Sequence, residues 1–179
     1  ISSCRCWFNF IYFGHDPKLI HILNGGLNKW LKEKRGITKD IPHIENSNYK
    51  SSEKKELVKD KYSIDENIKS KKFKVIDARS KDRFLGNVPE PRKGLRSGKI
   101  ENSFCIPFSY CINHDKTFKS KKELEKIFES CLGNINEKSI VFSCGSGVTA
   151  CVLALAYSLI NDKYQPSIYD GSWAEYGII

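Results

Sequence analysis

The sequence predicts an α/β fold, an open parallel sheet with helices on both faces. Short apolar segments such as 139–142 (SIVF) have the length and composition of buried strands. They alternate with segments of helical periodicity, which is the pattern of a parallel sheet. The helical segment 148–160 is apolar nearly all round, as expected for a buried helix. With 179 residues, 40% of them hydrophobic, the chain can bury a core.

The first part of the chain predicts an incomplete unit. A helix is expected to end near Gly14, followed by a buried strand within 19–26 (LIHILNGG) and a helix that begins near Leu27. Two glycines at the end of the strand segment allow a tight turn into the helix. A single strand between two helices would leave both its edges unpaired. Residues 1–42 are therefore predicted to be the tail of a separate α/β domain.

A linker is predicted between this tail and the main domain. The stretch from about residue 36 to residue 60 is polar, contains Pro42 and shows little periodicity. We therefore expect residues 43–60 to lie over the surface and residues 61–179 to form the main domain.

Two capping boxes are expected in the main domain. Ser63 with Glu66, and Ser120 with Glu123, each have the spacing in which two side chains satisfy the first amides of a helix. The second helix is amphipathic. Its apolar face carries Leu124, Ile127, Phe128, Cys131 and Leu132.

Three segments of the main domain predict strands. Residues 73–79 (FKVIDAR) form a buried strand that ends in charge, and 139–142 form a short central one. A last strand and turn are expected within 166–173 (PSIYDGSW).

The net charge of +9, from 30 Lys and Arg against 21 Asp and Glu, does not predict a nucleic-acid or membrane partner. The lysines within 51–62, 69–74 and 119–126 alternate with acids or lie on polar helix faces. No aromatic residues are interleaved with them in the manner of a nucleic-acid platform. Such mixed runs are typical of a solvated surface.

Seven cysteines, an odd number, cannot form a complete disulfide framework within one chain. Free thiols and a reducing compartment are therefore expected, cytoplasmic or else mitochondrial. The opening segment, residues 1–14, is apolar but short and contains Arg5, so we expect neither a membrane span nor a signal peptide. Cys4 and Cys6 lack a second ligand pair at zinc spacing, and no metal or cofactor is predicted.

Cys144 stands where the central strand meets the buried helix. Ligands of open parallel sheets bind at the carboxyl ends of strands, where this residue is expected. The free N–H groups at a helix start favour a thiolate over a thiol, and Gly145 and Gly147 allow successive amides to converge on one anion. The alternative is a small, inert core residue. Because such a residue needs no permissive backbone, we interpret the loop as a cradle for an ionised sulfur.

The segment 144–150 (CGSGVTA) resembles the active-site loop of the 3-mercaptopyruvate sulfurtransferases, members of the rhodanese superfamily. The surrounding residues 75–108 are similar to the segment that leads into the family's catalytic domain, and 169–173 (YDGSW) to its end. Residues 13–30 resemble the end of the family's first rhodanese-like domain. The resemblance extends over nearly the whole chain and is weakest in the linker.

This resemblance implies a role for the loop residues. Cys144 would take the sulfane sulfur of 3-mercaptopyruvate, release pyruvate and hold the sulfur as a persulfide. An acceptor thiol, such as thioredoxin or a low-molecular-weight thiol, or else cyanide, would then remove it. The persulfide would be stabilised by backbone amides of the loop, namely those of Gly145, Ser146, Gly147, Val148 and Thr149.

The resemblance also implies residues that bind substrate and move protons. Arg83 and Arg92 match the arginines that hold the substrate carboxylate, a task that suits the planar guanidinium fork. Arg79 is expected to pair structurally with Asp77. Ser146 matches a hydroxyl proposed to transfer protons together with an Asp and a His of the first domain, and no histidine of this sequence matches that position.

Three alternatives are weighed against this function. Cysteine phosphatases use a similar loop but place an arginine six residues after the nucleophile, where this chain has Ala150. An inert or redox-sensing rhodanese-like module would not need both candidate arginines. Thiosulfate is the rival sulfur donor, and relatives that prefer it carry basic residues inside the loop, whereas residues 145–150 carry no charge.

Overall fold

The computed structural model describes residues 1–133 and 139–179. The helices are α1 (Ser2–Tyr12), α2 (Gly26–Lys32), α3 (Lys61–Ser70), α4 (Lys81–Leu85), α5 (Lys121–Leu132), α6 (Ala150–Ser158) and α7 (Ser172–Tyr176). The strands are β1 (Val58–Lys59), β2 (Lys74–Asp77), β3 (Phe104–Cys105), β4 (Ile140–Ser143) and β5 (Ile168–Tyr169). Short 3-10 turns lie at Pro17–Leu19, Lys55–Leu57 and Phe108–Cys111.

The strands form one open parallel sheet in the order β1-β5-β4-β2-β3. β4 is central and pairs with β2 along its whole length, from Ile140 opposite Lys74 to Ser143 opposite Asp77. Both edge strands are two residues long. The predicted α/β class with a parallel sheet is confirmed, and 139–142 is its central strand.

Helices cover both faces of the sheet, as predicted. Successive strand residues point to opposite faces, so each face has its own core. On one face α1, α5 and α6 pack over Ile76, Ile140, Phe142 and Ile168. On the other, α3 and α7 contribute Ile64 and Trp173, which pack with Val75, Val141 and Tyr169.

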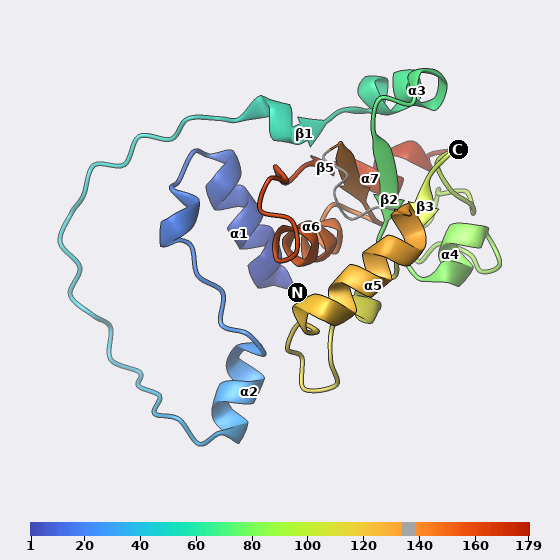
Figure 1. Ribbon diagram of the computed structural model, residues 1–179. Helices are drawn as coiled ribbons and strands as arrows, with labels where there is room; N and C mark the ends of the chain where they lie inside the picture. Colours follow the sequence, from blue (N-terminus) through green and yellow to red (C-terminus); the bar gives the residue numbers. More distant parts are fainter. Residues whose placement is uncertain (134–138) are drawn as a thin grey trace.

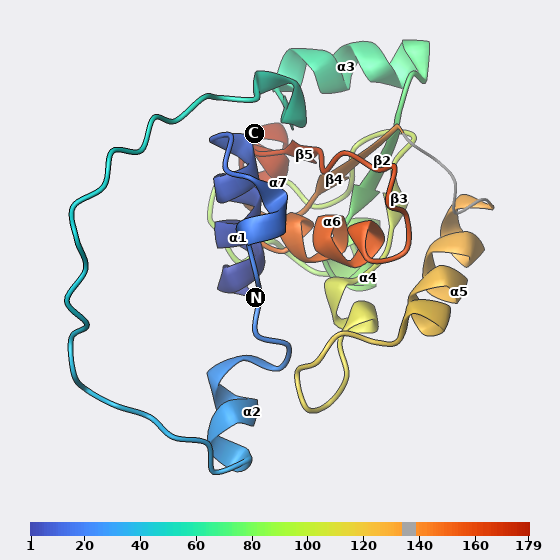
Figure 2. The ribbon, with the colours of Figure 1, turned by 60° about the vertical axis from the view of Figure 1, so that its left-hand side comes forward.

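α6 is buried over most of its surface. It packs against the sheet through β4 and β5 and against α1 and α5 on its flanks (Figures 1 and 2). Leu153, Ala154 and Tyr157 are completely buried. This position explains why the segment 148–160 is apolar nearly all round, because most of the helix surface is covered by other elements.

One of the two predicted capping boxes is confirmed. Ser120 and Glu123 cap α5 reciprocally. The box at Ser63 and Glu66 is wrong, because α3 begins earlier and the Asp60 carboxylate accepts the Ser63 N–H at 2.8 Å. Asp60 is itself a preferred N-cap residue, and it stands closer to the linker than the serine does.

The N-terminal segment differs from prediction in one element. Helices α1 and α2 form as expected, but residues 19–26 form no strand. The backbone at Ile20 is extended, and Ile20 and Ile22 pack partly against the main core while Leu19 and Leu23 are exposed. Apolar alternation is therefore present, but no strand of the described residues pairs with this segment.

The linker region runs outside the body of the protein. Residues 36–54 form neither helix nor strand, and Figure 2 shows them as an extended loop between α2 and β1. The edge strand β1 lies inside the predicted linker 43–60, since two half-buried residues carry no periodic signal. The assignment of residues 1–42 and 61–179 to separate domains stays a prediction; α1 itself packs into the core that contains α6.

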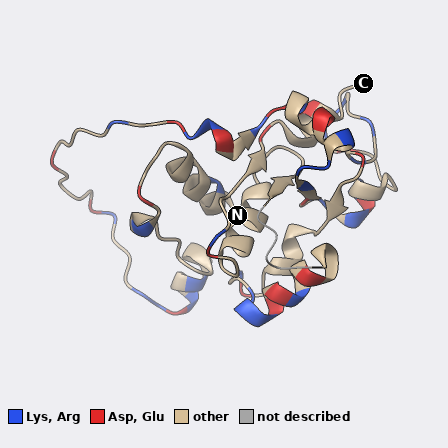
Figure 3. Ribbon diagram, turned by 45° about the horizontal axis from the view of Figure 1, so that its top comes forward, with Lys and Arg blue, Asp and Glu red and all other residues tan. Residues whose placement is uncertain are grey.

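The charged residues follow the predicted surface pattern. Figure 3 shows Lys and Arg interspersed with Asp and Glu along the ribbon. All seven cysteines are free thiols. Within residues 1–133 and 139–179, no helix combines the length and apolar character that crossing a bilayer requires.

Candidate functional site

Three strands end at one edge of the sheet, and the loops that follow them build the site. β2 leads to Arg79 and α4, β4 leads to Cys144, and β5 leads to the turn before α7. Because the strands are parallel, these three carboxyl ends meet at the same edge. The loop that begins at Cys144 therefore lies between the other two.

A cavity of about 240 Å³ opens at this edge. It is lined by Arg83, Glu90, Pro91, Arg92, Leu95, Cys144, Gly145, Ser146, Val148 and Thr149. The structure thus brings together all the predicted site residues except Gly147. The four histidines of the chain do not line it.

The Cys144 sulfur faces the cavity from a protected position. The residue is only 1% exposed, yet it is part of the cavity lining. Its Sγ accepts the N–H of Ser146, with 3.4 Å between nitrogen and sulfur. A backbone amide directed at the sulfur stabilises negative charge on it, which is the arrangement expected of an anion-binding loop.

Ser172 ties the loop to the strand beside it. Its Oγ accepts the N–H groups of Cys144 at 3.1 Å and Gly147 at 3.0 Å, and its hydroxyl donates to the Tyr169 carbonyl at 2.8 Å. Ser172 is completely buried and has a positive φ of 52°. The sequence analysis missed this role, although the residue lies within the quoted segment 169–173.

The placement of Gly147 therefore differs from the prediction. Its amide was expected to face the sulfur, but it donates to Ser172. Gly147 has φ of 75°, a left-handed conformation that side chains disfavour, so the glycine shapes the turn of the loop.

Helix α7 fixes the first residues of the loop from the other side. The amide of Trp173 donates to the Cys144 carbonyl, and that of Ala174 to the Gly145 carbonyl, both at 2.9 Å. The backbone polar groups on either side of the sulfur are thus satisfied by neighbouring elements, which leaves the loop little freedom. Trp173 fills the core behind the pocket.

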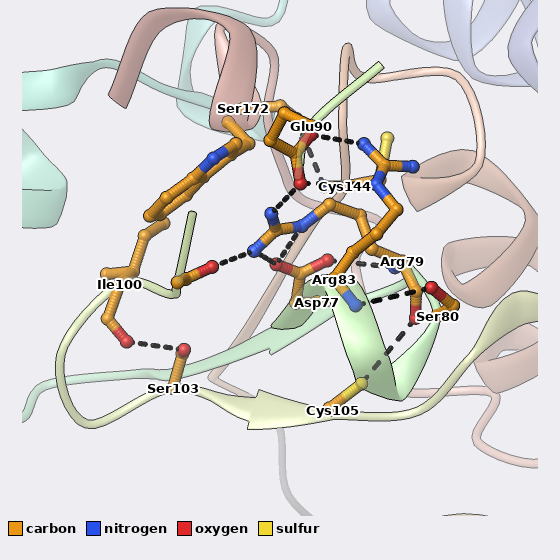
Figure 4. A network of polar contacts seen from close by, with 12 residues as sticks. Asp77, Arg79, Ser80, Arg83, Glu90, Ile100, Ser103, Cys105, Cys144 and Ser172 are labelled. Carbon is orange, nitrogen blue, oxygen red and sulfur yellow. Dashed lines mark hydrogen bonds and ion pairs between the residues drawn. The ribbon is translucent and has the colours of Figure 1, made fainter. Parts of the chain in front are cut away.

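Arg83 lies directly over the loop. A Cβ atom at Gly145 would be 3.0 Å from Arg83 Nη2, so a larger residue here would push the guanidinium away from the loop by a few tenths of an ångström. Two of its nitrogens are held by Glu90: Nε donates to Oε1 at 3.2 Å and Nη2 to Oε2 at 2.5 Å. Figure 4 shows this pair beside Cys144.

Glu90 is shared between two arginines. Its side chain is 1% exposed, and Oε1 also accepts Nη1 of Arg79 at 2.8 Å. Arg79 is completely buried, pairs with Asp77 at 2.7 Å and lies 4.3 Å from the ring of Trp173. The prediction that Arg79 pairs structurally with Asp77 is confirmed. The two carboxylates balance the two guanidinium groups.

Arg92 has a different setting. It is exposed, and no hydrogen bond or ion pair holds it to any residue in the described part of the chain. Since the charge of Arg83 is balanced by Glu90, Arg92 supplies the net positive charge of the cavity. A small anion would therefore bind there, with loop amides and Arg92 as its partners.

No candidate metal site accompanies this cavity. In residues 1–133 and 139–179, no group of three or more His, Cys, Asp or Glu side chains is arranged to hold a metal ion.

Comparisons with known proteins show the family of this chain. A family model described as rhodanese-like domain matches residues 60–178. Thiosulfate sulfurtransferase of Rattus norvegicus is 37% identical over 173 residues, which cover 96% of this chain and 57% of that protein. 3-Mercaptopyruvate sulfurtransferase of Mus musculus is 35% identical over 175 residues, which cover 98% and 58% respectively.

A solved structure shares the fold. The crystal structure of SseA from Escherichia coli, a 3-mercaptopyruvate sulfotransferase, matches 96% of this chain and 62% of its own length with a TM-score of 0.79 at 28% identity. The chain thus spans less than two thirds of the length of these proteins.

Replacing Ser172 by alanine is expected to loosen the loop. The amides of Cys144 and Gly147 would lose their buried acceptor, and the free energy of unfolding should fall by about 1–3 kcal/mol. Urea denaturation measures the change. Ser130→Ala, on the exposed side of α5, is the control and should leave stability unchanged to within about 0.5 kcal/mol. Equal effects of both variants would contradict this role.

The shared carboxylate predicts a pH dependence of stability. Burial opposes the charged form of Glu90, but hydrogen bonds from Arg83 and the charge of Arg79 outweigh it and lower the pKa below the ordinary 4.5. The ionised group therefore stabilises the fold above about pH 4.5, and this contribution is lost as pH falls through the lowered pKa.

Glu90→Gln should lower the free energy of unfolding near pH 7 by about 3 kcal/mol, because it leaves buried positive charge incompletely paired. The difference from the unsubstituted chain should shrink as urea denaturation is repeated at pH values below 4.5. Glu101→Gln, which changes an exposed glutamate, is the control. A difference that stayed constant with pH would show that the Glu90 charge is not involved.

Proposed function

The chain belongs to the family of rhodanese-like domain proteins, and we propose that it transfers the thiol sulfur of 3-mercaptopyruvate to a thiol or cyanide acceptor. A persulfide on Cys144 carries the sulfur between the two half-reactions, and pyruvate is the first product. The supporting observation is the cavity itself, in which the Cys144 sulfur and the guanidinium groups of Arg83 and Arg92 line one small space.

The first half-reaction is a nucleophilic attack by the Cys144 thiolate on the sulfur of 3-mercaptopyruvate. A sulfur–sulfur bond forms and the carbon–sulfur bond breaks, with its electron pair left on the carbon as an enolate. The proton of the donor thiol ends on that carbon and gives pyruvate, so the cysteine is left as a persulfide anion. The Ser146 amide, which already donates to Sγ, supports the negative sulfur.

The second half-reaction returns the cysteine to its starting state. An acceptor thiolate, or cyanide, attacks the outer sulfur of the persulfide and forms a bond to it. The sulfur–sulfur bond to Cys144 breaks, and its electron pair stays on Cys144 as a thiolate. Because the sulfur lines a cavity of only about 240 Å³, a protein acceptor such as thioredoxin must insert its reactive thiol at the mouth, near the exposed Val148.

A reducing compartment, cytoplasmic or mitochondrial, would keep such acceptors and the seven thiols of this chain reduced.

Ser146 is our candidate for moving the proton. It lines the cavity next to the nucleophile. By the family resemblance its partners are an Asp and a His of the first rhodanese-like domain. The four histidines of this chain do not line the cavity.

The charge of the site favours 3-mercaptopyruvate over thiosulfate as the donor. The four charges of Asp77, Arg79, Arg83 and Glu90 sum to zero, and residues 145–150 carry none. Arg92 is then the one unpaired positive charge among these site residues. A single positive charge matches the one carboxylate of 3-mercaptopyruvate better than the two negative charges of thiosulfate. Thiosulfate is expected to react through the same cysteine but less well.

The persulfide can be tested by mass. The full chain incubated with 3-mercaptopyruvate should gain one sulfur atom, which a thiol reductant removes, because Cys144 accepts it covalently. Cys144→Ser should gain none, whereas Cys6→Ser, which changes an exposed cysteine, should behave as the unsubstituted chain. Intact-protein mass spectrometry makes the comparison. An equal gain by Cys144→Ser, or no gain by the unsubstituted chain, would refute the proposal and favour an inert or redox-sensing module.

Arg92→Ala should separate the two donors. Loss of a charge-assisted hydrogen bond of about 1.5–3 kcal/mol raises KM for 3-mercaptopyruvate roughly ten- to hundredfold. KM for thiosulfate should rise much less, since this dianion has no planar carboxylate to match the guanidinium fork of Arg92. Steady-state kinetics with each donor measure the split, and the exposed neighbour Lys93→Ala serves as the control. Equal increases for both donors would count against the donor assignment.

A further inference from the structure

Arg5 reaches the active-site loop from outside the matched domain. It lies on α1, far ahead of residues 60–178, which match the rhodanese-like model. Its Nη1 donates to Oδ1 of Asp170, the residue that follows β5. A side chain of the N-terminal segment thus meets one of the loops that build the site.

The Arg5–Asp170 pair lies directly on the turn at Gly147. A Cβ atom at Gly147 would be 2.6 Å from Asp170 Oδ1 and 2.9 Å from Arg5 Nη1. Both groups therefore occupy the space that a side chain at this position would need. The left-handed turn of the loop is packed against an ion pair and not against solvent.

Other contacts hold the same glycine. Its amide donates to Ser172 Oγ at 3.0 Å, and its carbonyl accepts the Cys151 thiol at 3.2 Å. Burial raises the pKa of Cys151 to about 12, although the positive charge of Arg5 acts in the opposite direction, so the group stays a thiol and can donate. Gly147 is thus fixed by groups from α7, α6 and α1 and by Asp170, the residue that follows β5.

The helix that carries Arg5 is firmly seated. Cys4, Trp7, Phe8 and Ile11 of α1 are buried in the core that contains α6, and Figures 1 and 2 show the two helices side by side. The guanidinium is therefore attached to a rigid element. Its side chain is 28% exposed and that of Asp170 is 47% exposed, so the pair adds little to overall stability.

We propose that Arg5 is a positioning residue for sulfur transfer, which acts through Asp170 and Gly147 to hold the Cys144 loop in its reactive geometry. This inference rests on the function proposed above. Misplacement of a reacting group by a fraction of an ångström lowers rates strongly even where binding is intact. Arg5 touches neither the cavity nor the arginines that line it, so its removal should change the chemical step and leave donor binding alone.

The test compares Arg5→Ala, Arg5→Lys and Asp170→Asn in the full chain with 3-mercaptopyruvate as donor. Arg5→Ala should lower kcat roughly tenfold with KM changed less than about twofold. Arg5→Lys keeps a cation and should recover part of kcat. The double variant Arg5→Ala with Asp170→Asn should lose little more than Arg5→Ala alone, because both substitutions break the same link. Arg35→Ala, which breaks an exposed pair with Glu33 on the same N-terminal segment, is the matched control and should leave kcat unchanged.

A second readout does not depend on turnover. The rate at which iodoacetamide alkylates Cys144, followed by peptide mass spectrometry, should rise in Arg5→Ala and stay the same in Arg35→Ala, since a loosened loop exposes the sulfur. Unaltered kcat and alkylation in Arg5→Ala would overturn the inference, as would a loss of kcat that matched a loss of stability in urea. If the unsubstituted chain shows no sulfur transfer at all, the proposed function fails, and the alkylation rates alone decide the role of Arg5.

Discussion

Glu90 and the two guanidinium groups that share it fix the geometry on which the candidate site depends. A buried carboxylate is costly unless it is paired, and Arg79 and Arg83 together satisfy it. Arg79 is in turn bound to Asp77 at the end of β2, so the position of Arg83 over Gly145 is set from the sheet. The Cys144 loop is held in the same way from β5 and α7. Both walls of the cavity are thus attached to the carboxyl edge of one sheet.

The fold could be predicted wherever the signal was local. The alternation of strands with helices, the apolar segment of α6 and the capping box at Ser120 are all properties of short windows, and each was confirmed. The prediction of a strand within 19–26 was wrong because a strand needs a partner strand to pair with. Alternating apolar residues do not show whether such a partner is present. The cap of α3 was misjudged for a different reason. Asp60 and Ser63 are both N-cap candidates for α3. Asp60 comes first in the chain, and its carboxylate accepts the Ser63 N–H in the first turn of the helix.

The site was predictable in part. Cys144 at a strand-to-helix junction with two glycines was visible in the sequence, and the family resemblance supplied Arg83 and Arg92. What could not be predicted was which groups hold these residues in place. Glu90 meets two arginines, Ser172 accepts amides from a loop 25 to 28 residues away, and Arg5 meets Asp170 across 165 residues. Such pairs form only when the chain has folded, and no sequence spacing predicts them. The prediction for the Gly147 amide differed from the structure for the same reason, since its acceptor, Ser172, belongs to α7.

The brevity of β1 and β3 has a consequence for the behaviour of the protein in a crowded solution. The strand at each border of the sheet is only two residues long, so each border presents a short row of unpaired backbone groups. Long, flat borders invite a second molecule to add its own strand, which is the first step of many ordered aggregates. A sheet whose central strands are longer than its edge strands offers very little template for such growth, even though its interior strands are buried.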